Sequence, residues 1–332
     1  MRRRRFVLAL GAALLTGGIA VPVSAQTTTI ARVGILSGAS LSTPANAARF
    51  HEAFVESLRK LGWERGRNLI IEARYTEGRP ELFAPGAAEL VALSPDVIVA
   101  PSSQAVAAVL AKTSSIPIVM LNVSHPVEAG FIKSLASSDS NVTGFANQAN
   151  DSEYKALELL REVSPGIARV GVLYSPSNAS SALAIKLLLA TPPSALGFSV
   201  VPVPIDSPAD IDTAFAIIDR AGLRAAEVYP TPMITANGAR IAALLIDRRV
   251  PTVTLQSNFV RDGILMSYGS DQVEGWRGAA AYVDRILRGA KPADLPVQQP
   301  TKFLFVINLK TAKAIGVEIS PSLLARADEV IE

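Results

Sequence analysis

A repeated series of apolar segments constrains the fold of this chain more than any other feature. Three segments of the first half have counterparts in the second half, in the same order and at offsets of 137, 130 and 134 residues: ARVGILS (31–37) with ARVGVLY (168–174), DVIV (96–99) with AEVY (226–229), and IPIV (116–119) with VPTV (250–253). A single match of this length is expected by chance among Val-rich strands. Because three matches keep their order and spacing, the sequence predicts two lobes of similar topology.

Short strands alternate with longer helical patterns in each copy. In the first copy, apolar strands are expected at 33–36, 69–71, 97–100 and 118–121. A helix follows the first strand, with Thr43 as candidate N-cap, Pro44 in the first helical position and Gly62 as its stop. Its apolar face consists of Phe50, Phe54, Leu58 and Leu61. Strands and helices in alternation form a parallel sheet covered on both faces. We therefore expect an α/β fold of two similar, doubly wound parallel-sheet lobes joined by a multi-strand hinge.

Small polar residues follow nearly every expected strand. In open parallel sheets, ligands bind beyond the carboxyl ends of the strands, where helix N-termini present unpaired backbone N–H groups. Serine, asparagine and proline are also ordinary turn residues, so one such loop alone indicates little. Six loops at one cleft between two lobes predict a site for a small polar ligand. The candidate ligand-binding residues are Ser37, Gly38, Ser102, Ser103, Gln104, Asn122, His125, Tyr174, Ser177, Asn178, Tyr229, Thr231, Ser257, Asn258, Tyr268 and Asp271.

Two kinds of side chain in this set would recognise different ligand groups. Tyr174, Tyr229 and Tyr268 each end an expected strand, where a ring stacks on a ligand or, equally well, packs between strand and helix. For an amino-acid ligand, the carboxylate would meet donors at 102–104 or 177–178. Asp271 is the candidate acceptor for the ammonium group, and its alternative role is to cap the following helix.

The N-terminal residues have the pattern of an export signal. Four arginines at 2–5 precede an apolar run at 6–21, and Val23-Ser24-Ala25 supplies the small residues that signal peptidase reads. We therefore expect a signal peptide at 1–25, cleavage before Gln26 and a periplasmic protein, exported by either the general or the twin-arginine route. A membrane anchor is the alternative, but the apolar run is short of the ~20 residues that a bilayer span needs.

The positive charge of the chain belongs to this signal. Without the arginines at 2–5, the 32 basic residues fall to 28, against 29 acidic ones. The basic pI therefore does not indicate binding to nucleic acid.

Residues suited to catalysis are sparse. The chain contains no cysteine and only two histidines, of which His51 is expected on a solvated helix face. It has no Gly-x-Ser-x-Gly motif, no clustered metal ligands and no Gly-rich phosphate loop. We predict no enzymatic activity, no cofactor and no metal site.

Several short motifs along the chain resemble those of one family: GRNL (66–69), EGRP (77–80), NVTG (141–144), MSYG (266–269), GAKPADLP (289–296) and VINLKTAK (306–313). Together they are similar to ABC-transporter substrate-binding proteins related to the tryptophan-uptake binding protein, which have the type I periplasmic binding protein fold. The chain departs from this family at His125, where members often carry an acidic residue before the Pro-Val pair, and at 138–140, where a Gly-rich segment is usual.

The resemblance implies a periplasmic protein that delivers a small molecule to an ABC permease in the inner membrane. Some members bind aromatic amino acids, so an amino acid, aromatic by preference, is the expected ligand. An exported sensory subunit for a membrane receptor would share the fold and the cleft and stays an alternative, with a cleft enzyme as a further one. We expect a monomer that does not bind nucleic acid.

The expected lobes follow from the repeat and the resemblance together. Lobe 1 comprises 26–145 plus 269–297, and lobe 2 comprises 146–268 plus 298–332. Connections between the lobes are expected near 141–150, 262–268 and 296–303.

Overall fold

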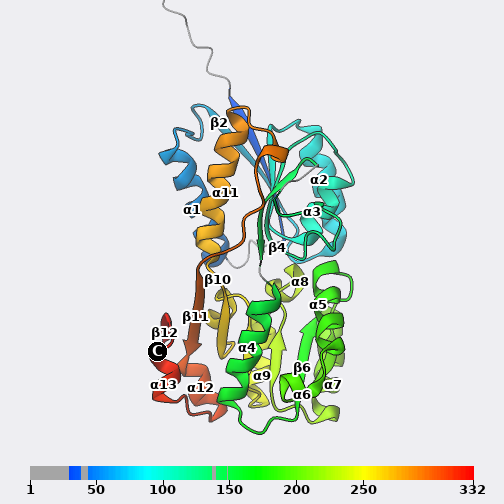
Figure 1. Cartoon of the computed structure of the whole chain (residues 1–332), viewed down its shortest axis with the longest axis vertical. Helices are drawn as coiled ribbons and strands as arrows, with labels where there is room; N and C mark the ends of the chain where they lie inside the picture. Colours follow the sequence, from blue (N-terminus) through cyan, green and yellow to red (C-terminus); the bar gives the residue numbers. More distant parts are fainter. Residues whose placement is uncertain (1–29, 39–43, 137–139, 148) are drawn as a thin grey trace, which may run out of the picture.

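The computed structural model describes residues 30–38, 44–136, 140–147 and 149–332, so the expected signal peptide and its cleavage site lie outside the described residues. Two β-sheets lie one above the other along the long axis of the molecule, and helices flank each sheet (Figure 1). The expected α/β class with two doubly wound lobes is therefore confirmed.

The first sheet consists of five parallel strands in the order β2-β1-β3-β4-β5. The strands are β1 (Ala31–Ser37), β2 (Leu69–Tyr75), β3 (Val97–Ala100), β4 (Ile118–Ser124) and β5 (Val142–Asn147). Its helices are α1 (Pro44–Lys60), the short 3₁₀ helix η1 (Pro80–Leu82), α2 (Phe83–Ala92), α3 (Ser103–Leu110) and α11 (Gln272–Leu287). Alternate side chains point to opposite faces of the sheet. Val33 and Ile35 pack with α1 and α11, whereas Leu36 and Ile98 pack with α2 and α3.

The second sheet has the order β12-β11-β10-β9-β8-β6-β7, and only the β10–β11 pairing is antiparallel. The strands are β6 (Arg169–Tyr174), β7 (Ser199–Pro204), β8 (Ala226–Val228), β9 (Thr252–Thr254), β10 (Met266–Ser270), β11 (Phe303–Asn308) and β12 (Glu329–Ile331). The helices around it are α4 (Ala149–Val163), α5 (Ala179–Ala190), α6 (Pro193–Leu196), η2 (Pro208–Asp210), α7 (Ile211–Ala221), α8 (Pro232–Ala236), α9 (Gly238–Asp247), α10 (Asn258–Arg261), α12 (Leu309–Ile315) and α13 (Pro321–Leu324). Helix η3 (Pro292–Asp294) lies on the return path to β11.

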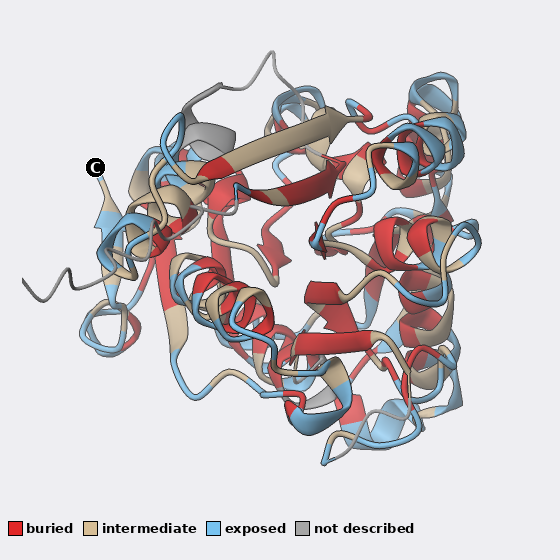
Figure 2. Ribbon diagram, turned by 90° about the horizontal axis from the view of Figure 1, so that it is seen from above, coloured by how far each residue is buried: buried red, intermediate tan, exposed pale blue. Residues whose placement is uncertain are grey.

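The sequence repeat corresponds to a repeat in three dimensions. The order β2-β1-β3-β4-β5 of the first sheet recurs as β7-β6-β8-β9-β10 in the second. The three repeated segments form β1 and β6, β3 and β8, and β4 and β9, which occupy equivalent positions in the two sheets. Figure 2 shows the buried residues gathered in the strands and on the inward sides of the helices, as this layered arrangement requires.

Helix α11 belongs to the first lobe although it comes late in the chain. It lies beside α1 in Figure 1, and the indole N–H of Trp63 donates to Asp284 Oδ1 at 2.8 Å. The rings of Phe54 and Trp276 meet edge to face, with their centroids 5.8 Å apart. The chain therefore returns to the first lobe for one helix before it completes the second sheet with β11 and β12.

The connection expected at 262–268 lies instead within the second lobe. Ile264 and Leu265 are fully buried in that lobe, and β10 continues to Ser270 as part of its sheet. The apolar side chains of this segment fix it to the second core, so the chain leaves the lobe only between β10 and α11.

Candidate functional site

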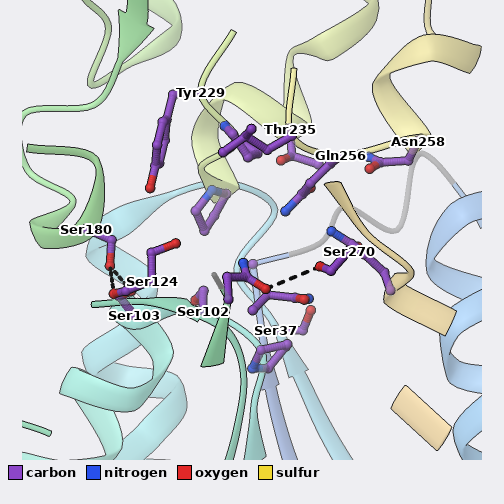
Figure 3. Close-up of a pocket in the computed structure, with 18 of the residues that line it drawn as sticks. Ser37, Ser102, Ser103, Ser124, Ser180, Tyr229, Thr235, Gln256, Asn258 and Ser270 are labelled. Atoms are coloured by element: carbon purple, nitrogen blue, oxygen red, sulfur yellow. Dashed lines mark hydrogen bonds between the residues drawn. The ribbon is translucent and has the colours of Figure 1, made fainter. Parts of the chain in front are cut away.

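A pocket lies between the two lobes, at the carboxyl ends of the strands of both sheets (Figure 3). It encloses about 1190 Å³, including the space at its mouth. Its lining residues are Ser37, Gly38, Phe50, Pro101, Ser102, Ser103, Asn122, Ser124, Asn147, Asn178, Ser180, Tyr229, Pro230, Pro232, Thr235, Leu255, Gln256, Asn258, Asp262, Ser270, Gln272 and Trp276. This is the position at which open parallel sheets bind their ligands.

Two helix N-termini open onto the pocket, one from each lobe. Ser102 caps α3 by accepting a hydrogen bond from the Ala105 N–H at 3.2 Å, and Asn178 caps α5 by accepting from the Ser181 N–H at 3.0 Å. The positive end of each helix dipole favours negative charge nearby. The described lining residues include no arginine, lysine or histidine, so neutral donors and these helix ends are what the pocket offers to an anionic group.

Three aromatic side chains contribute to the lining. Phe50 comes from α1, Trp276 from α11, and Tyr229 follows β8 on the other lobe. Aromatic faces on both sides of a cleft suit a flat apolar group of a ligand, because rings stack favourably on each other. The pocket thus combines polar groups suited to orienting a ligand with aromatic surface suited to holding its apolar part.

The lobes touch each other around the pocket. The hydroxyl oxygens of Ser103 and Ser180 are 2.5 Å apart, and Ser180 Oγ also donates to the Ser124 carbonyl oxygen at 2.9 Å. On another side, Ser270 Oγ donates to Asn147 Oδ1 at 3.3 Å. Figure 3 shows these bonds joining strands and helices of the two lobes. Both walls of the pocket are therefore in place, and we call this arrangement, in which the lobes meet, the closed form.

Two buried acids lie in the second lobe next to the pocket wall. Burial raises the pKa of Glu153, on α4, to about 8. Burial and then the charge of Glu153 raise the pKa of Glu227, on β8, well above its usual value. Burial, followed by the charge of Glu153, also raises the pKa of the Tyr229 hydroxyl. The phenol of Tyr229 is thus held neutral and suited to hydrogen bonding at the pocket.

The structure brings half of the candidate binding residues together at the pocket. Those that line it are Ser37, Gly38, Ser102, Ser103, Asn122, Asn178, Tyr229 and Asn258. The candidates outside the lining are Gln104, His125, Tyr174, Ser177, Thr231, Ser257, Tyr268 and Asp271.

Hydrogen bonds within the protein hold three of the outlying side chains. Ser177 Oγ donates to Asp206 Oδ1 at 2.8 Å, and Thr231 caps α8 by accepting from the Ile234 N–H at 3.4 Å. Asp271 accepts from the N–H groups of Val273 and Glu274 at the start of α11. Its carboxylate also pairs with Lys302 Nζ at 3.0 Å. Asp271 therefore has the capping role that was its alternative interpretation.

Packing or burial accounts for most of the other outlying candidates. The Tyr268 ring stacks on Phe303 with centroids 5.9 Å apart, and Tyr174 packs against the core of the second lobe. The Oε1 of Gln104 and the Nε2 of His125 are both buried, and neither has a hydrogen-bond partner in the described part of the chain. Ser257 precedes α10 but makes no side-chain capping bond.

Several pocket residues have no marker in the sequence. Phe50 and Trp276 belong to helices whose apolar faces predict core packing, and both also reach the pocket because α1 and α11 begin at its edge. Asp262 lies in a segment expected to connect the lobes. Ser124 and Gln256 occur in the polar strand-end loops, which is the one signal that points to them.

Comparison with known proteins agrees with this architecture. The family model for ABC transporter substrate binding proteins matches residues 33–331. A tyrosine-binding protein of Clostridioides difficile is 25% identical over 268 residues, which cover 80% of this chain and 76% of that protein.

Solved structures share the fold. A conserved domain protein from Vibrio cholerae superposes with a TM-score of 0.82 at 25% identity, over 91% of this chain and 100% of that one. An ABC domain from Streptococcus pneumoniae in complex with L-Trp gives a TM-score of 0.82 at 24% identity, again over 91% and 100% of the two chains.

The described residues include no helix long and apolar enough to cross a membrane. Nor do they include a group of three or more His, Cys, Asp or Glu side chains that could hold a metal ion. With the family model matching nearly the whole chain, this protein belongs to the ABC transporter substrate binding protein family.

Proposed function

We propose that this protein is the periplasmic solute-binding component of an ABC uptake transporter and that its ligand is an amino acid with an aromatic side chain. The observation that carries the proposal is the interlobe pocket, in which Phe50, Tyr229 and Trp276 lie among neutral hydroxyl and amide groups. The curated relative is named for tyrosine binding, and it covers most of this chain. The aromatic residues of the lining suit a flat aromatic side chain, and the lining's hydroxyl and amide groups suit the polar groups on the α-carbon of an amino acid.

The N-terminus of α3 is the proposed receptor for the ligand carboxylate. Ser102 and Ser103 lie at this helix start and line the pocket, and no cationic side chain of the described lining competes for the anion. Backbone N–H groups at a helix N-terminus bind carboxylates through hydrogen bonds and the helix dipole together.

Ligand capture is proposed to stabilise the closed form. In this structure the bond between Ser103 and Ser180 joins the two lobes, and the bond between Ser270 and Asn147 joins them where the chain crosses between them. A ligand that touches both walls adds further contacts to the closed form and shifts the equilibrium toward it. A permease that recognises the closed surface would then distinguish loaded from empty protein. Export by the N-terminal signal would place the protein in the periplasm.

Tryptophan fluorescence during amino-acid titration tests the ligand assignment. The chain contains two tryptophans, and Trp276 lines the pocket whereas Trp63 pairs with Asp284 outside it. L-tyrosine, L-tryptophan and L-phenylalanine should bind, as measured by calorimetry, and L-tyrosine and L-phenylalanine should also change the emission of wild type and Trp63→Phe. The emission of Trp276→Phe should not respond. Heats of binding for charged or small aliphatic amino acids, but none for aromatic ones, would contradict the assignment.

A further inference from the structure

One wall of the pocket carries two hydrogen-bond acceptors from a single short helix. Asn258 begins α10 and Asp262 directly follows its last residue, and both side chains line the pocket. Residues four apart on a helix lie on the same face, one turn from each other. Thr235 and Gln256 belong to the same wall, and Figure 3 shows Gln256 and Asn258 side by side on the second lobe. This wall therefore presents a carboxylate and an amide oxygen together.

Neither acceptor has a donor among the residues that the structure describes. The Oδ1 atom of Asn258 is buried, with the residue 8% exposed, and no described group donates a hydrogen bond to it. Asp262 is half-buried, and no hydrogen bond or ion pair to its carboxylate is found among the described residues. Burial alone raises the pKa of this carboxyl group above its usual value. A partly desolvated carboxylate without a donor is unfavourable unless a ligand supplies one.

The surroundings leave the Asp262 carboxylate accessible from the pocket. Its Oδ2 lies beside Gly238, the first residue of α9, where a β-carbon would come within 3.0 Å of it. The missing side chain at Gly238 makes room for the carboxylate, and the positive end of α9 favours its negative charge. The N–H groups of α9 nevertheless donate no hydrogen bond to it among the described residues, so this helix end does not satisfy the carboxylate.

Asp262 is the only charged side chain among the described lining residues. We propose that Asp262, together with Asn258, forms a subsite for a cationic nitrogen of the ligand, which is the ammonium group of an amino acid. This inference rests on the proposed solute-binding function and adds the group that recognises the ammonium. An ammonium has three N–H donors, so it satisfies both acceptors and neutralises the buried charge.

The subsite also gives the ligand contacts with both lobes. Asp262 and Asn258 belong to the second lobe, whereas the α3 N-terminus proposed for the carboxylate belongs to the first. An amino acid held at its carboxylate by one lobe and at its ammonium by the other bridges the cleft. A ligand that lacks either charged group loses one of the two anchors.

Paired ligands with and without the ammonium test this subsite. Calorimetry is carried out with L-tyrosine and with 3-(4-hydroxyphenyl)propanoate, which differs only in lacking the amino group. Wild type should bind L-tyrosine at least about tenfold more tightly than the desamino compound, because a charge-assisted hydrogen bond is lost. In Asp262→Asn, affinity for L-tyrosine should fall about tenfold or more, while affinity for the desamino compound stays within about twofold of wild type.

Controls separate this result from a structural effect and from a wrong ligand. Asp247→Asn removes a charge from an exposed position on the same lobe and should leave both affinities unchanged. A purely structural role of Asp262 would lower both affinities together or change only the melting temperature, and either result would overturn the subsite.

If no aromatic amino acid binds, the aromatic assignment fails, and the subsite is judged on other compounds. A thermal-shift screen then compares each amino acid with its desamino acid. Stabilisation of wild type by amino acids alone, with loss of the shift in Asp262→Asn, would support the subsite. Equal stabilisation by the desamino acids would overturn it.

Discussion

At the residue scale, Glu227 is the most unusual ionisable group of the described chain. It lies on β8 with no exposed surface, and neither of its carboxyl oxygens has a hydrogen-bond partner. Glu153 on α4 shares this environment, and burial raises the pKa of both acids. An acid whose pKa is higher in the folded than in the unfolded state keeps its proton in the folded state. The free energy of unfolding therefore falls as the pH rises from the unfolded-state pKa to the folded-state pKa.

Glu227→Gln should remove the part of this pH dependence that Glu227 contributes, while the part from Glu153 remains. The free energy of unfolding of wild type should fall between about pH 4.5 and pH 8, by up to ~1.4 kcal/mol per pH unit for each proton retained only in the folded state. Glutamine has no proton to lose, so the variant should be more stable than wild type at pH 8 and show a flatter profile. Urea denaturation at pH 5, 6.5 and 8 measures this. Glu158→Gln, at an exposed ion-paired position on α4, the helix of Glu153, serves as the control with a wild-type profile. Parallel profiles for wild type and Glu227→Gln would refute the explanation.

The roles of two aspartates, Asp271 and Asp262, could not be assigned from the sequence. Asp271 and Asp262 both lie near the lobe connections, and position in the chain favours Asp271, since it follows β10 directly. An aspartate just before a helix can either cap that helix or accept a hydrogen bond from a ligand, and the sequence does not distinguish the two roles. For Asp271, the bonds from the N–H groups of α11 identify the capping role. Asp262 belongs to no sequence motif, and its proposed role rests on the absence of a partner for its carboxylate among the described residues, which only the three-dimensional structure reveals.

At the element scale, the lobes meet where α8 of the second lobe approaches two glycine turns of the first. A β-carbon at Gly38 would lie 2.4 Å from the Pro232 side chain. At Gly78, a β-carbon would lie 2.5 Å from Ala236 Cβ and 2.9 Å from the Pro232 carbonyl oxygen. These turns lack side chains at the points of contact, which lets the loops after β1 and β2 reach α8 in the closed form.

Gly78→Ala should therefore weaken ligand binding by hindering closure. The methyl group would collide with α8 only when the lobes are together, so the open form is favoured and the affinity for L-tyrosine should fall by about tenfold. Gly130→Ala is a matched control, since Gly78 and Gly130 both have φ of 73° but nothing lies within 4 Å of a β-carbon at Gly130. Both variants should lose similar stability from the left-handed backbone. Calorimetry compares their affinities, and equal loss in the two variants would show that closure is not involved.

The elements were predictable from sequence to a greater extent than the site. Apolar periodicity and the glycine stop locate α1, whose end fits Gly62 with its φ of 96°, whereas the expected N-cap Thr43 lies outside the described residues. The repeat predicts that the two lobes share one topology, because apolar runs in equivalent positions form equivalent strands, but the strand order itself comes from the structure. The expected lobe 1 already includes residues 269–297, and therefore α11, through the repeat and the family resemblance together. The contacts that hold this helix there, such as those of Trp276 with Phe54, join segments more than two hundred residues apart and have no marker in the sequence.

At the scale of the whole molecule, both lobes contribute residues to a single pocket. The strand-end loops of both sheets supply the polar lining, and α1 and α11 supply aromatic groups from the first lobe. Asp262 and Asn258 face them from the second lobe. In the proposed function, binding and closure form a single equilibrium, because a ligand would complete contacts that neither lobe makes alone.

Small-angle X-ray scattering with and without saturating L-tyrosine measures whether ligand binding closes the two lobes. The ligand-free protein should have a larger radius of gyration than the bound protein, and the bound profile should match the closed structure with its Ser103–Ser180 contact. Asp262→Asn, at the same ligand concentration, should remain closer to the open profile. Identical scattering profiles for free and bound protein, with calorimetry showing the ligand bound, would contradict the account.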